Sequence, residues 1–119
     1  MNELNIEEML RHCMHCALWS SVGDNDEPLD QNHGIEDISP ETMKAIREDC
    51  EAFAAKAQAL IIESNLTVEQ IGHDFWLTRN RHGTGFWDRG ETGKKLSVIA
   101  QEFNEVWFYE GDDGLIYHA

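Results

Sequence analysis

Apolar side chains recur every three or four residues in three parts of the chain, residues 5–20, 39–63 and 91–103. This spacing places the apolar side chains on one face of an α-helix, with polar side chains on the other. The sequence therefore predicts three amphipathic helices. None of the apolar runs approaches the roughly 20 residues that a membrane-spanning helix needs, so we expect no contact with a membrane interior.

Local capping signals indicate where two of the helical segments begin. Ser39 is a good N-cap, and Pro40 favours the first position of a helix. The run Thr67-Val-Glu-Gln70 is typical of a capping box, in which the first and last side chains bond each other's backbone N–H groups. It predicts a short helical turn that ends near Gly72.

Two hairpins are predicted from short apolar runs around turn residues. Residues 75–79 and 84–87 are rich in aromatic side chains and flank the glycine-containing segment 80–83. Residues 106–109 and 115–117 flank Gly111-Asp-Asp-Gly114 in the same way. The segments together predict one α+β domain over residues 1–119, with an antiparallel sheet of about four strands and helices packed on one face of it.

An acidic loop interrupts the predicted helices over residues 20–39, where turn-forming residues are frequent. Leu29, Ile35 and Ile38 are expected to attach it to the core. The acids of this loop do not complete the pattern of a calcium-binding loop, because Leu29 and Ile35 occupy the positions where that pattern requires glycine and glutamate. The loop is either a solvated surface or a surface that contacts a partner through Asp24, Asp26, Glu27, Asp30, Glu36 and Asp37.

The net charge of −14 limits the partners that the protein can bind. Nucleic acid binds basic surfaces, so direct binding of nucleic acid is not expected. A strongly acidic protein attracts basic surfaces instead. We therefore expect a protein partner with a basic surface.

The three cysteines, Cys13, Cys16 and Cys50, are expected to be reduced, because no secretion signal is visible and their number is odd. The protein is accordingly expected in the cytoplasm. Cys13 and Cys16 lie on the apolar face of the first predicted helix, while His12 and His15 diverge from each other. A closed zinc site needs its ligands to converge on one ion, which these side chains do not do, so we expect core thiols, no metal and no cofactor.

The segment 73–90 concentrates aromatic side chains, arginines and histidines in a chain that is otherwise acidic. It has three interpretations: a core hairpin, a pocket for a small ligand, or a protein-binding patch. If it is a strand, Arg79 and Arg81 share the face of Phe75 and should be partly buried and bonded to acids, with His82 at the exposed tip. The residues of the alternative ligand site are His73, Trp76, Arg79, Arg81, His82, Trp87 and Arg89.

Catalytic motifs are not apparent. His73 and Asp74 are adjacent, so on a strand they would point to opposite faces and could not form a dyad. No nucleophile motif accompanies them, and Gly83 and Gly85 do not have the spacing of a phosphate-binding loop. We therefore expect no catalytic residues and no enzymatic activity.

Several motifs resemble a widespread family of small acidic bacteriophage and mobile-element proteins that has no settled activity. The most specific are His73-Asp-Phe-Trp-Leu-Thr-Arg-Asn80 and Gly85-Phe-Trp-Asp-Arg-Gly90, and the similarity extends over nearly the whole chain from residue 17 onward. The resemblance implies an accessory phage protein in the bacterial cytoplasm. In that setting, the expected function is to bind a host macromolecule and to inhibit a nucleic-acid-handling defence protein through an acidic, DNA-mimicking surface. The alternative is a ligand-binding or catalytic domain that uses residues 73–90.

Overall fold

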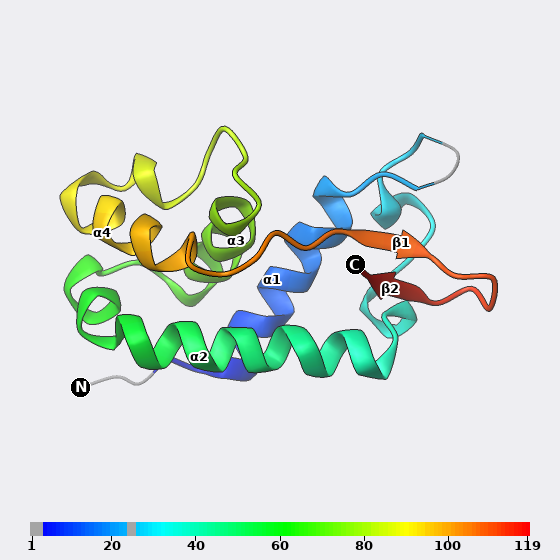
Figure 1. Ribbon diagram of the computed structural model, residues 1–119, viewed down its shortest axis with the longest axis horizontal. Coiled ribbons are helices and arrows are strands. Elements are labelled where there is room, and N and C mark those ends of the chain that lie inside the picture. The colour runs from blue at the N-terminus through cyan, green and yellow to red at the C-terminus, as the bar shows by residue number, and fades with distance from the viewer. Residues whose placement is uncertain (1–3, 24–25) are drawn as a thin grey trace.

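A computed structural model describes residues 4–23 and 26–119 of the protein. Within this part of the chain, four α-helices form most of the fold: α1 (Ile6–Ser20), α2 (Pro40–Ser64), α3 (Val68–Arg79) and α4 (Gly90–Ala100). Figure 1 shows α2 running along the length of the molecule, with α1 crossing it. α4 lies at one end and a small hairpin at the other. The molecule is elongated, with extents of 43 × 26 × 21 Å.

The predictions for α1, α2 and α4 are confirmed, and capping explains where α1 and α2 begin. Asn5 accepts a hydrogen bond from the backbone N–H of Glu8, and Ser39 accepts one from that of Thr42. These bonds satisfy N–H groups that the first turn of a helix leaves without partners. α2 ends at Ser64, and the following Asn65 adopts the left-handed conformation that commonly terminates helices.

The predicted strand 75–79 is wrong, because these residues belong to α3. The capping box of Thr67 and Gln70 is present as expected, but the helix continues for 12 residues. α3 is buried on nearly all sides, including the consecutive residues Asp74–Arg79. A helix that is enclosed in this way lacks the row of polar residues that marks an amphipathic helix. In the sequence, its aromatic run therefore has the same pattern as a buried strand.

The predicted strand 84–87 is wrong as well. Its residues form a bend and a short 3-10 turn, η3 (Phe86–Asp88), in which the backbone N–H of Phe86 donates to the hydroxyl of Thr78 at 3.0 Å. The first hairpin is therefore absent. In place of an α+β domain with a four-stranded sheet covered by helices on one face, the fold is mostly helical with a two-stranded sheet.

The C-terminal hairpin is confirmed. β1 (Phe108–Glu110) pairs antiparallel with β2 (Ile116–His118), and Tyr109 faces Tyr117 across the pair. Trp107 and Ala119 exchange two backbone hydrogen bonds beyond the strands, of 3.1 and 2.9 Å. The hairpin packs beside the start of α2 (Figure 1).

The acidic loop is held by two 3-10 turns, η1 (Leu29–Gln31) and η2 (Ile35–Asp37). Leu29 and Ile38 are buried and Ile35 packs against the core, as expected. The three cysteines are buried and form no disulfide, which confirms their assignment as core thiols. No helix in the described part of the chain has the length and hydrophobicity to cross a membrane.

The crossing of α1 and α3 depends on Gly72. A β-carbon at this position would lie 2.7 Å from the carbonyl oxygen of Met9 and 3.0 Å from the β-carbon of His12. The first contact, which is to backbone, is too short for a side chain, and the second is tight. The absence of a side chain therefore permits the two helices to approach closely.

We predict that Gly72→Ala destabilises the protein by about 1–3 kcal/mol, which is the usual cost of overpacking a core. At an exposed helical position the same change would stabilise the helix by up to about 1 kcal/mol. The sign of the change in stability therefore shows whether position 72 is tightly packed or free to accept a side chain. Urea unfolding provides the measurement. An increase in stability would show that the close crossing does not restrict this position.

Candidate functional site

The two edges of the hairpin differ in what covers them. Along the outer edge of β2, Ile116 pairs with Ile38 in a parallel bridge, and its carbonyl accepts from the N–H of Ser39 at 2.9 Å. On β1, the register directs the N–H and C=O of Phe108 away from β2. These two groups have no hydrogen-bond partner among the described residues. The outer edge of β2 is thus covered at Ile116, whereas the edge of β1 is open for pairing at Phe108.

A groove of about 350 Å³ lies beside Phe108, where β1 begins. Residues 105–108 form one side of it, and residues 20–22, at the end of α1, form the other. Trp76 and His82 also line the groove, as does Asn80, whose side chain accepts a 2.8 Å hydrogen bond from the N–H of Val106. Its walls therefore come from three segments that are distant in the sequence.

The opposite wall of the groove also offers backbone groups. Val22 faces Pro28 in an antiparallel bridge. The backbone hydrogen bonds that form this bridge are made by the two residues that flank Val22 in the sequence. The N–H and C=O of Val22 consequently point away from Pro28, and they have no partner in the described part of the chain. Val22 and Phe108 thus present open backbone groups from the two walls of one groove.

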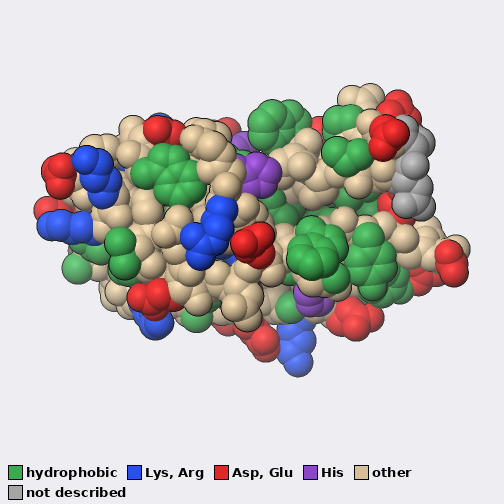
Figure 2. Space-filling view, turned by 45° about the horizontal axis from the view of Figure 1, so that its top comes forward, with side chains coloured by type: hydrophobic (Ala, Val, Ile, Leu, Met, Phe, Trp, Pro, Cys, Tyr) green, Lys and Arg blue, Asp and Glu red, His purple; other side chains and the backbone are tan. Residues whose placement is uncertain are grey.

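Large apolar side chains are exposed around this groove. Trp107 is 61% exposed and Val22 is 58% exposed, and Tyr109 follows on the same face of the hairpin as Trp107. Figure 2 shows hydrophobic side chains gathered at the end of the molecule that carries the hairpin, with acidic side chains around them. Exposed clusters of this kind, with a polar rim, are typical of protein-binding surfaces.

The acidic loop adjoins the hairpin at this end of the molecule. Asp26, Glu27, Asp30 and Glu36 are exposed, whereas Asp37 is half-buried. Asp24 lies outside the described residues. The loop therefore presents most of the predicted acidic side chains to solvent.

His33 joins the acidic loop to β1. Its Nδ1 lies 3.2 Å from an oxygen of Asp37, and its Nε2 lies 2.8 Å from an oxygen of Glu110. Carboxylates only accept hydrogen bonds, so both ring nitrogens must carry protons. The hydrogen bond to Glu110, reinforced by Asp37, raises the pKa of His33.

We predict that His33→Gln lowers stability more at pH 6 than at pH 9. Because the pKa of His33 is raised in the folded state, its contribution is full below the unfolded value of about 6.5 and is lost as pH rises through the folded value. The loss at pH 6 should not exceed about 1 kcal/mol, since the pair is partly solvated. Urea unfolding at both pH values measures it, and an equal loss at both would contradict the ion pairs.

The arginines of segment 73–90 are occupied by internal partners. Arg79 is buried, and its Nη1 lies 2.8 Å from an oxygen of Asp49. Its Nε and Nη2 donate to the carbonyl of Asn104 at 3.0 and 2.7 Å. Arg89 lies 2.8 Å from the buried carboxylate of Asp74. Arg79 is therefore unavailable to a phosphate or carboxylate ligand, and Arg89, which is 35% exposed, is already paired with an acid of the protein itself.

The expectations for the neighbouring side chains are confirmed only in part. Arg79 is buried and bonded to an acid, as expected. Arg81 is exposed, and its Nε lies 3.5 Å from a carboxylate oxygen of Glu105. His82 is half-buried in the groove and does not form an exposed tip. The strand argument fails because Arg79 ends a helix and Arg81 adopts a positive φ of 59° in the turn that follows.

The seven residues of the alternative ligand site do not line one groove. Trp76 and His82 line the groove beside β1, whereas His73 faces α1. The ring nitrogen of Trp87 donates to the carbonyl of Gly83 within its own loop, at 3.4 Å. Only two of the seven therefore contribute to the groove.

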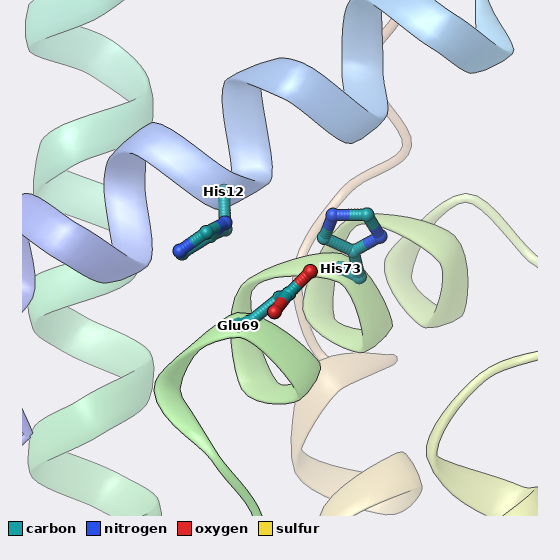
Figure 3. Close-up of side chains that lie close together, drawn as sticks. All are labelled: His12, Glu69 and His73. Atoms are coloured by element: carbon teal, nitrogen blue, oxygen red, sulfur yellow. The ribbon is translucent and has the colours of Figure 1, made fainter.

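A group of metal-ligating side chains lies elsewhere, between α1 and α3. His12 comes from α1, and Glu69 and His73 come from α3 (Figure 3). One ligand atom of each lies within 4.8 Å of the others. The sequence contained part of this signal in the four-residue spacing of Glu69 and His73, but nothing in it placed His12 opposite them.

Comparison of the chain with protein-family models, with curated proteins and with solved structures finds no match. The functional assignment therefore depends on the geometry of the sites themselves.

Proposed function

We propose that the protein recognises an extended, basic segment of a protein partner, which adds as a strand to the open edge of β1. The observation that carries this proposal is the pair of open backbone groups on Phe108 and Val22 along one groove. Strand addition uses such groups for affinity and neighbouring side-chain contacts for specificity. An edge strand without a cover is a ready template for this kind of pairing.

The apolar side chains support the same mode of binding. Trp107, just before β1, and Tyr109, within it, project from the exposed face of the hairpin, while Phe108 between them is buried. A strand added beside β1 would place every second side chain on the exposed face, next to these aromatics. We therefore expect apolar residues in the partner at alternate positions.

The charge distribution indicates that the remaining positions of the partner are basic. The net charge is −14, and Glu105 lines the groove, while exposed acids of the loop flank the hairpin. Acidic surroundings increase the rate of encounter with basic segments and disfavour acidic ones. Binding should weaken as salt rises, because charges in solvent are screened over about 10 Å at 0.1 M ionic strength.

The rival function, a pocket that binds an anionic ligand or performs catalysis through residues 73–90, has less support. Its arginines Arg79 and Arg89 are bonded to acids of the protein itself. The phage-borne setting, the host defence target and DNA mimicry stay predictions. The present proposal is narrower, since it specifies only the chemistry of the partner segment.

Selection of peptides from a random displayed library tests the proposal. We expect the wild-type protein to enrich segments in which basic and apolar residues alternate. Val22→Lys should abolish the enrichment, because it places a cation at the groove wall. Val98→Lys is the matched control, since Val98 is similarly exposed, at 64%, but lies on α4. Enrichment of acidic segments, or equal effects of both variants, would contradict the proposal.

A further inference from the structure

His12, Glu69 and His73 form a ligand set that the peptide groove does not use. Glu69 and His73 are four residues apart on α3, so their side chains project from the same face of the helix. His12 opposes them from α1, and Figure 3 shows the three side chains between the two helices. Pairs of ligands one helical turn apart, completed by a third ligand from another element, are a common way to bind a transition metal.

The backbone beneath these side chains is closely packed. Gly72, which precedes His73, contacts α1 at the position of His12, where a β-carbon would lie 3.0 Å from that of His12. The thiol of Cys16 donates to the carbonyl of His73 at 3.8 Å. The two helices therefore cross closely at this position, and the three ligand atoms already lie within 4.8 Å of one another.

The ligand atoms are available for binding. Among the described residues, neither the ring nitrogens of His73 nor the carboxylate of Glu69 form a hydrogen bond. Arg11 lies 3.5 Å from the ring of His12, but its guanidinium is bonded to Glu8 at 3.0 and 3.1 Å.

We propose that His12, Glu69 and His73 bind one divalent transition-metal ion of the zinc type, with water in the remaining position. Two imidazoles and one carboxylate suit zinc and cobalt better than magnesium or calcium, which prefer oxygen ligands alone. The ion would connect α1 and α3 at their crossing. A site with three protein ligands and one water has the ligand number of catalytic zinc centres.

Calorimetric titration of chelator-treated protein with zinc chloride tests the proposal. We expect one zinc ion per chain and a higher melting temperature in the presence of zinc, because the ion binds the folded state. Titration with cobalt chloride should produce the visible absorption of a four-coordinate site. Failure of zinc to bind, or zinc binding without any rise in melting temperature, would overturn the proposal.

Variants then identify the ligands. Glu69→Gln changes an exposed side chain and should preserve the fold while lowering zinc affinity at least about tenfold. His12→Gln and His73→Gln should have the same effect. His15→Gln is the matched control, because His15 is the exposed neighbour whose ring centre lies 6.5 Å from that of His12. Zinc affinity that is unchanged in Glu69→Gln, or lost equally in His15→Gln, would contradict this ligand set.

Discussion

Arg79→Met should lower the free energy of unfolding by about 1–3 kcal/mol, the usual cost of leaving hydrogen-bond acceptors without their donor, because Arg79 is buried although its partner Asp49 is 35% exposed. Arg79 is 4% exposed and bonds both Asp49 and the carbonyl of Asn104. Its guanidinium also lies 5.4 Å from the ring centre of Phe75 and 5.6 Å from that of Phe103. Methionine can fill the space, but it leaves the carboxylate and the carbonyl without their donors.

Arg81→Met is the matched control for this prediction. Arg81 is close in the sequence, but its side chain is 56% exposed and its contact with Glu105 is long, at 3.5 Å. Exposed pairs of this kind contribute at most about 1 kcal/mol. Urea unfolding of both variants measures the two losses of stability. Equal losses would mean that the hydrogen bonds of Arg79 contribute no more than the exposed pair of Arg81.

Trp107→Ala should weaken binding of a selected basic peptide by about 30-fold or more, corresponding to the loss of about 2 kcal/mol that defines a hot spot. Trp107 lines the groove and is 61% exposed, so the free protein loses little packing when the ring is removed. The melting temperature should therefore change little. Fluorescence anisotropy of a labelled peptide measures the affinity.

Trp19→Ala is the control for the loss of an exposed indole. Trp19 is also 61% exposed, but it does not line the groove beside β1. We expect the affinity of Trp19→Ala to stay within about twofold of the wild type, since contacts outside the centre of an interface contribute little. If removal of Trp19 costs as much as removal of Trp107, the binding surface extends beyond the groove or lies elsewhere.

The elements that the sequence predicts correctly are those with local signals. α1, α2 and α4 have apolar stripes, and the C-terminal hairpin has a strong turn between its strands. α3 is different, because it is enclosed by the rest of the fold and its aromatic run carries no helical period. Its misassignment as a strand produced the incorrect four-stranded sheet and the incorrect face for Arg81.

The groove and the metal-ligating group could not be predicted because each forms only on folding. The groove brings residues 20–22 beside residues 105–108, and no local pattern links two segments so far apart. His12 meets His73 because Gly72 permits a close crossing of α1 and α3. The acidic loop, in contrast, could be found from composition alone, since its side chains are mostly exposed.

The exchange rate of the Phe108 amide proton, measured with and without a selected basic peptide, tests the central claim most directly. This N–H points away from β2 and has no partner in the described part of the chain. If the peptide adds as a strand, its carbonyl accepts this proton, and exchange should slow at least about tenfold, as expected when opening costs 1.4 kcal/mol or more. An unchanged rate at saturating peptide would contradict strand addition at β1.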